Sequence, residues 1–211
     1  MTQEPGTKGL TPLKPVKRIA FLDRDGVINH DSPDYIKSWS EFHFLPGSIE
    51  AIKRLTLNRF LVFLITNQSA VSRGMISQKG LEYIHSCMMR EVEKGGGYIN
   101  DIFYCPHLPE DNCTCRKPEP GLIYMSQKAY NLDISSAVMV GDSSKDIECA
   151  VNAGCGMTVL VRTGNGNKAE EILKAKNIRP DFIANDLYHA VDWIIPRTFA
   201  GGLVKRGAHL K

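Results

Sequence analysis

The sequence has no long hydrophobic run and no strong excess of either charge. Its longest apolar stretch, Phe60 to Ile65, is far shorter than the roughly 20 residues that a membrane helix needs. No N-terminal segment resembles a signal peptide, so we expect a cytoplasmic protein without a membrane partner. The net charge is only +3, whereas nucleic-acid binding normally requires a concentrated basic surface. A nucleic-acid partner is therefore not expected.

The sequence also lacks internal repeats and low-complexity blocks, so a solenoid is not expected. Instead, near-continuous apolar runs alternate with segments of helical periodicity, which predicts a Rossmann-like, doubly wound α/β domain with a parallel sheet. The expected strands are 18–23, 60–66, 99–105, 137–141, 157–162 and 181–184, and the expected helices are 48–58, 77–94, 121–131, 143–153, 168–176 and 187–195. We expect one domain over 17–197, with flexible tails at 1–16 and 198–211.

Polar residues follow the ends of the predicted strands. Asp23 and Asp25 follow the first strand, Thr66 ends the second, Lys117 comes after the third, and Asp142 follows the fourth. Because ligands of open α/β sheets bind at the carboxyl ends of the strands, these groups are expected to converge. Such an oxygen-rich site fits Mg²⁺. The expected ligands are the carboxylates of Asp23 and Asp142 and the backbone carbonyl of Asp25, with Ser143 or Asp146 as a further candidate.

These residue types suit hydrolysis of a phosphate monoester, whose negative charge repels a nucleophile. Mg²⁺, Lys117 and Thr66 would offset that charge. Asp23 would attack phosphorus and form an aspartyl-phosphate, while Asp25 would protonate the leaving alcohol and then accept a proton from the hydrolytic water. The sequence therefore predicts a magnesium-dependent phosphomonoester hydrolase.

At these positions the chain resembles the haloacid dehalogenase (HAD) superfamily of phosphohydrolases. The motifs that carry the resemblance are Asp23 to Val27, Thr66, Lys117, and Asp142 with Asp146, and the similarity covers residues 18 to about 190. Val27 departs from the threonine that is usual in the superfamily. Only about two dozen residues separate Asp25 from the helix expected at Ser48, too few for a separate cap domain. We therefore expect an open HAD core in which short loops select the substrate.

The segment from Cys105 to Cys115 carries four candidate zinc ligands. Cys105, His107, Cys113 and Cys115 form a Cys₃His set, which is typical of a closed, structural zinc site without an open position for water. The loop has little apolar surface to bury, so zinc is expected to stabilise it and thereby position Arg116 and Lys117. The other cysteines (Cys87, Cys149, Cys155) are interpreted as ordinary buried residues.

Within the superfamily, the zinc loop resembles two groups, the D-glycero-D-manno-heptose 1,7-bisphosphate 7-phosphatases of lipopolysaccharide-core precursor synthesis and the histidinol-phosphate phosphatases. The fragments Thr66 to Gly74 and Arg116 to Gly121 resemble the heptose enzymes more closely. That resemblance implies removal of the sugar 7-phosphate, with histidinol phosphate as the alternative substrate. It also implies substrate-binding roles for Arg24, Asp31, Tyr35, Asn67, Gln68 and Ser69. Arg116 and Arg73 are expected to bind the second phosphate of a bisphosphate, because guanidinium groups offer bidentate partners for it. Ser143 stands where the heptose enzymes often have lysine.

Two other classes of function share parts of this pattern. A phosphoacceptor signalling domain also has acids and a lysine at strand ends, but it does not need a second acid such as Asp25. A zinc-dependent nucleic-acid module would need basic and aromatic residues around the cluster, whereas Glu110, Asp111 and Glu119 flank it. A phosphatase acting on a small phosphorylated sugar remains the favoured hypothesis. A small domain without an exposed apolar stripe is expected to be a monomer.

Overall fold

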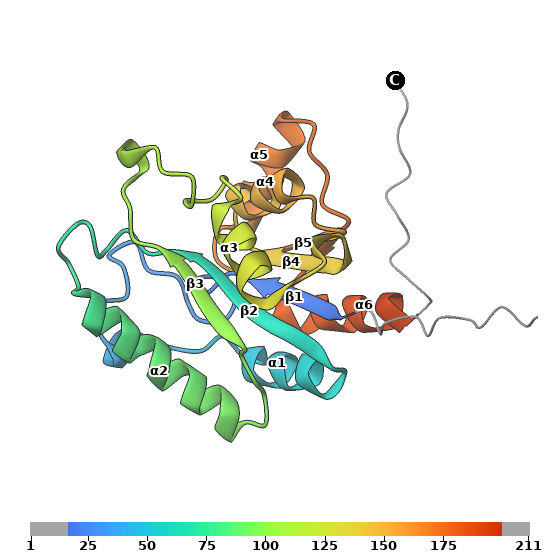
Figure 1. Ribbon diagram of the computed structural model, residues 1–211, viewed down its shortest axis with the longest axis horizontal. Coiled ribbons are helices and arrows are strands. Elements are labelled where there is room, and N and C mark those ends of the chain that lie inside the picture. The colour runs from blue at the N-terminus through green and yellow to red at the C-terminus, as the bar shows by residue number, and fades with distance from the viewer. Residues whose placement is uncertain (1–16, 200–211) are drawn as a thin grey trace, which may run out of the picture.

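The computed structural model describes residues 17–199, which form a single parallel sheet with helices on both faces (Figure 1). The strand order is β3-β2-β1-β4-β5-β6, and every neighbouring pair is parallel. The strands are β1 Arg18–Leu22, β2 Phe60–Asn67, β3 Asp101–Cys105, β4 Ala137–Gly141, β5 Met157–Val161 and β6 Phe182–Ala184. The order reverses between β1 and β4, which brings the ends of β1, β2 and β4 together at one edge.

Helices cover the two faces in groups of three. Helices α1 (Ser48–Leu57), α2 (Gln78–Lys94) and α6 (Leu187–Phe199) lie on one face, and α3 (Gly121–Tyr130), α4 (Ser144–Ala153) and α5 (Gly166–Ala175) lie on the other (Figure 1). Short 3₁₀ turns lie at Trp39–Glu41, Pro109–Asp111 and Ile134–Ser136. The predicted doubly wound α/β fold is confirmed. Helix α6 extends two residues past the domain boundary expected at 197, and the rest of both expected tails lies outside the described residues.

The local sequence explains why these elements form. Strand β4 is buried along its whole length, as expected for a central strand covered on both faces. Ser77 caps α2 by accepting a hydrogen bond from the Gly80 N–H, and Ser143 with Asp146 forms a capping box at the start of α4, each satisfying N–H groups that the helix leaves unpaired. Cys87, Cys149 and Cys155 are buried, as predicted.

The connection between β1 and α1 contains no separate cap domain. Its middle is held by an aromatic cluster, in which the rings of Trp39 and Phe42 stack at 5.0 Å and those of Phe42 and Phe44 meet edge-on at 5.1 Å. Such contacts anchor a loop that has little regular structure. This connection therefore leaves the carboxyl ends of the strands uncovered by a separate domain, as the sequence predicts. Among the described residues, no helix is both long enough and apolar enough to span a membrane.

Candidate active site

A polar cleft of about 330 Å³ lies at the carboxyl ends of the central strands. It is large enough for a small phosphorylated molecule. Residues that follow β1, together with residues of β2, the segment before α3, and the starts of α4 and α5, line it, among them Asp23, Asp25, Thr66, Lys117 and Asp142. The convergence that the sequence predicted from strand ends is therefore present in the structure.

Lys117 lies at the centre of the cleft and is 3% exposed. Its ammonium group contacts the Asp23 carboxylate at 2.9 Å, pairs with Asp146, and donates to the Ile65 carbonyl at 2.7 Å. Burial lowers the pKa of this lysine, but the two carboxylates outweigh burial and raise it above its ordinary value. Lys117 is thus held as a cation with fixed orientation.

Three buried carboxylates surround this one lysine. Ligand atoms of Asp23, Asp142 and Asp146 lie within 4.8 Å of one another. Burial, together with repulsion from Asp146, raises the pKa of Asp23 to about 7 although Lys117 opposes the shift, and burial with the same repulsion raises that of Asp142 to about 8. This excess of buried negative charge, carried by oxygen donors, fits a hard divalent cation such as Mg²⁺.

The two further magnesium candidates, Asp146 and Ser143, both have protein partners. One oxygen of Asp146 pairs with Lys117, and the other accepts the Ser143 N–H at 2.9 Å. The Ser143 hydroxyl accepts the Lys145 N–H at 3.2 Å. Both side chains are therefore committed to the start of α4 and to Lys117. Asp142 is the acid from this segment that faces the cleft with the fewest protein partners.

The backbone closes tightly around Asp142. A Cβ on Gly26 or on Gly164 would lie 2.1 Å from its Oδ2 atom, and both glycines have positive φ (+78° and +58°). Only glycine fits there without a clash. Asn165 donates its backbone N–H to the same oxygen at 2.7 Å, and its side-chain amide reaches Asp31 at 2.9 Å. Sequence reasoning missed Asn165, because no strand-end acid or known motif marks it.

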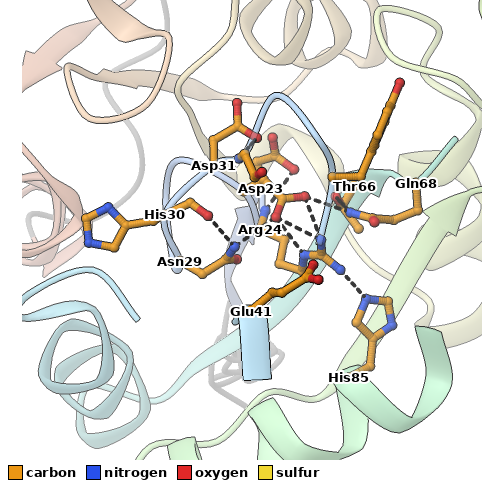
Figure 2. A network of polar contacts seen from close by, with 12 residues as sticks. Asp23, Arg24, Asn29, His30, Asp31, Glu41, Thr66, Gln68 and His85 are labelled. Carbon is orange, nitrogen blue, oxygen red and sulfur yellow. Dashed lines mark hydrogen bonds and ion pairs between the residues drawn. The ribbon is translucent and has the colours of Figure 1, made fainter. Parts of the chain in front are cut away.

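A polar network that includes Arg24, Asn29 and Gln68 (Figure 2) surrounds the carboxylate of Asp25. The Arg24 guanidinium donates to both of its oxygens, and Asn29 and Gln68 donate to it at 2.8 and 2.9 Å. Burial raises the pKa of Asp25, but Arg24 and these hydrogen bonds outweigh burial and lower it below its ordinary value. Arg24 was expected to bind substrate. Arg24 belongs to the cleft lining, and its side chain is 1% exposed and directed to Asp25 and His85.

The predicted residues at the end of β2 and just after it divide into those that line the cleft and those that do not. Thr66, Asn67 and Gln68 line the cleft, and the Gln68 amide donates to the Thr66 hydroxyl at 3.0 Å. Asn67, expected to bind substrate, donates to the Lys117 carbonyl at 3.2 Å and accepts the Lys117 N–H at 3.0 Å. It therefore fixes the backbone of the lysine. The cleft lining does not include Ser69 or Arg73.

The rim of the cleft carries the expected loop residues and an additional lysine. Asp31 and Tyr35 line the cleft on one side, and the Arg73 guanidinium lies 5.8 Å from the Tyr35 ring centre. On the other side, Arg116 and Lys145 line both this cleft and an adjoining hollow of about 490 Å³ beside the Cys/His loop. Two cations thus border the opening, and Lys145 was missed because it lies inside a helix-start motif.

The predicted zinc ligands meet in the structure. The Cys105, Cys113 and Cys115 sulfurs lie 3.3–3.5 Å apart, and His107 Nδ1 lies 3.3 Å from the Cys115 sulfur and 3.5 Å from that of Cys105. Tetrahedral zinc with bonds of about 2.3 Å to sulfur has edges of roughly 3.8 Å. The four donors therefore fit a closed zinc site. Arg116, which lines the cleft, donates to the His107 carbonyl at 3.0 Å and so links this loop to the cleft.

Comparison with known proteins places this site in a family. Residues 114–190 match the family model described as HAD-hydrolase-like. A Bordetella bronchiseptica protein named D-glycero-beta-D-manno-heptose-1,7-bisphosphate 7-phosphatase is 45% identical over 151 residues, which cover 72% of this chain and 84% of the relative. The chain belongs to the HAD-like hydrolase family. A HAD-like protein of the same name from Pseudomonas aeruginosa is 45% identical over 71% of this chain and 84% of its own length.

Solved structures of HAD-like proteins agree with the fold. The crystal structure of D,D-heptose 1,7-bisphosphate phosphatase from B. bronchiseptica, complexed with magnesium and phosphate, has a TM-score of 0.78 and 40% identity, covering 85% of this chain and 98% of that one. The corresponding enzyme from Burkholderia thailandensis has a TM-score of 0.63 and 31% identity, covering 84% and 98%. The predictions of a HAD-type fold and of a phosphoric monoester hydrolase are confirmed.

Proposed function

We propose that the protein removes the 7-phosphate of D-glycero-D-manno-heptose 1,7-bisphosphate. The observation that carries this proposal is the combination of a cleft lined by Asp23, Asp25 and Lys117 with relatives of that name at 45% identity. The same relatives support a place in the synthesis of lipopolysaccharide-core precursors.

The first half of the proposed reaction transfers the phosphoryl group to the protein. A carboxylate oxygen of Asp23 attacks phosphorus while the bond from phosphorus to the sugar oxygen breaks. Lys117, at 2.9 Å from Asp23, and the Thr66 hydroxyl stabilise the charge on the phosphoryl oxygens. Asp25 takes up a proton from solvent as the substrate binds and gives it to the departing sugar oxygen, because an alkoxide is a poor leaving group. Asp25 then carries a negative charge again, in the environment that favours its ionised form.

The second half releases inorganic phosphate. Water attacks the aspartyl-phosphate, Asp25 takes a proton from that water, and Asp23 is regenerated. Mg²⁺, held by the carboxylates of Asp23 and Asp142 and the backbone carbonyl of Asp25, would offset the negative charge that nucleophile and phosphate bring together. Asp146 orients Lys117 in this scheme. Asp142 is itself oriented by the Asn165 N–H at 2.7 Å.

The rim residues are proposed to select the substrate. Asp31 and Tyr35 face the sugar hydroxyls, and Asn165 holds Asp31 by a 2.9 Å hydrogen bond. The phosphate that is not hydrolysed is proposed to contact Arg116 and Lys145, which border the cleft opening, because cations bind phosphate by charge-assisted hydrogen bonds. We propose that zinc in the Cys₃His loop holds Arg116 in this position through the His107 carbonyl.

We also propose that the protein is a cytoplasmic monomer. The thiol groups of the Cys₃His loop support the location, because they must stay reduced to bind zinc. Size-exclusion chromatography with light scattering tests the monomer, and a dimer mass at micromolar concentration would contradict it.

A phosphate-release assay tests the substrate. The purified protein is given each anomer of the heptose bisphosphate, histidinol phosphate and simple sugar monophosphates, with magnesium and with a chelator. We expect magnesium-dependent release that is fastest from the heptose bisphosphate. Faster release from histidinol phosphate would overturn the heptose assignment and leave the mechanism intact. Asp23→Asn should abolish release, whereas Asp133→Asn, an exposed carboxylate outside the cleft lining, should not.

A further inference from the structure

His85 is a buried titratable residue to which the proposed mechanism gives no part. It lies on α2, on the face that packs toward the sheet, and is 5% exposed. In Figure 2 its ring points toward Arg24, and Nε2 lies 3.2 Å from Arg24 Nη1. The Tyr104 ring packs edge-on against it at 5.8 Å. His85 therefore joins a helix at the periphery to the centre of the cleft.

The guanidinium of Arg24 is divided between two partners. Its Nε and Nη2 atoms donate to Asp25, at 3.1 Å and at 2.8 Å to each oxygen, in the bidentate geometry that fixes the plane of a carboxylate. Its Nη1 atom donates to His85. Arg24 is 1% exposed, so water does not readily replace a lost partner. Without an acceptor at position 85, a buried cationic donor would be left unsatisfied.

His85 can fill this role only while its ring is neutral. An imidazolium has no free lone pair and would place a second cation against Arg24. Burial and the Arg24 charge lower the pKa of His85 to about 3, with Asp25 partly opposing the shift. The hydrogen bond also fixes the tautomer, because Nε2 must accept and the proton must lie on Nδ1.

We propose that His85 is a positioning residue for the acid step, which sets the orientation of the Asp25 carboxylate through Arg24. The inference rests on the proposed role of Asp25 as general acid and base. A proton transfer from Asp25 requires one oxygen to face the leaving group, and a rotation of the carboxylate plane lengthens that transfer distance. His85 fixes one end of the guanidinium, and the guanidinium fixes the carboxylate at its other end.

The chemistry of the leaving group separates this role from a merely structural one. A sugar oxygen needs a proton as it departs, whereas p-nitrophenyl phosphate releases a phenolate that is stable without one. The ratio kcat/KM includes only the steps up to the release of the alcohol, so it isolates the acid step from the later hydrolysis. A disturbed Asp25 therefore lowers kcat/KM for the sugar phosphate much more than for the aryl phosphate.

Three variants of the full, magnesium-loaded protein test the proposal. His85→Phe keeps an aromatic ring and removes the acceptor. It should lower kcat/KM for the sugar phosphate about tenfold or more, which is a fraction of the roughly 10²–10⁴-fold contribution of a general acid. It should lower kcat/KM for p-nitrophenyl phosphate by less than about threefold. His85→Gln returns an acceptor and should restore most of the kcat/KM for the sugar phosphate relative to that for p-nitrophenyl phosphate. Met88 is a buried residue of α2, so Met88→Ala should destabilise the protein but leave the kcat/KM of the sugar phosphate relative to that of p-nitrophenyl phosphate unchanged. Equal losses on both substrates for His85→Phe, or no rescue by His85→Gln, would overturn the proposal.

Asp25→Asn distinguishes the failure of this inference from the failure of the function on which it rests. If Asp25→Asn itself shows no dependence on the leaving group, the acid role of Asp25 is wrong. If Asp25→Asn shows the dependence and His85→Phe does not, only the role of His85 is wrong. The best sugar phosphate of the substrate screen serves as the alkyl substrate, so a wrong heptose assignment does not affect the comparison.

Discussion

The buried histidine makes a quantitative prediction about stability and pH. His85 has a pKa of about 3 in the folded protein and an ordinary value of 6.5 when unfolded. Because the folded pKa is depressed, unfolding takes up a proton at any pH between these two values. The contribution of His85 to the free energy of unfolding is therefore fully present above about pH 6.5 and falls as the pH is lowered toward 3.

The size of the effect follows from the two pKa values. Between about pH 7.5 and about pH 5.5, the unfolded histidine changes from mostly neutral to mostly charged, and the folded histidine stays neutral. The resulting loss is about 1.4 kcal/mol, one pKa unit of free energy. His85→Phe removes this group, so the difference in stability between the wild type and the variant should shrink by about 1.4 kcal/mol over that range.

Urea unfolding at both pH values measures this difference, with magnesium and zinc concentrations held constant. All other titrating groups, including the remaining five histidines, are shared by both proteins, so they cancel from the difference. Met88→Ala serves as the matched control, because it should lower stability and keep the pH dependence of the wild type. If wild type and His85→Phe lose stability in parallel, the pKa of His85 is not depressed in the folded protein, and the neutral ring that accepts from Arg24 is not favoured there.

Three further predictions concern the supports of the site. Cys113→Ser should reduce bound zinc from about one ion per chain and lower both stability and activity. Metal analysis with thermal unfolding checks this, and zinc loss at wild-type stability would refute the structural role. Asn67→Leu removes both hydrogen bonds to the Lys117 backbone, so it should lower the free energy of unfolding by about 2–4 kcal/mol and also lower kcat. Urea unfolding and phosphate release measure these two effects, and an unchanged kcat would contradict a positioning role. Gly164→Ala places a Cβ 2.1 Å from the Asp142 carboxylate and should raise the magnesium concentration needed for half-maximal activity; an unchanged magnesium titration would show that the backbone yields there without moving Asp142.

Much of the proposed reaction centre was predictable from the sequence for a simple reason. Parallel strands end at a common edge, so acids that follow β1 and β4 meet a hydroxyl that ends β2 wherever the strands are recognised. The four zinc ligands were predictable because short loops between paired ligands leave few other arrangements. The strands themselves were recognisable because burial on both faces requires near-continuous apolar runs.

The sequence alone thus determined the fold class, the strand-end acids, Lys117 and the Cys₃His loop, because each depends on local pattern and on one rule of topology. Only the tertiary structure decided what their neighbours do. Arg24 lies within the motif, but its guanidinium is held between Asp25 and a partner 61 positions away, His85. Asn67 holds a backbone 50 positions away. No periodicity encodes such pairs, because their partners are set by how α2 and the Cys/His loop pack on the sheet.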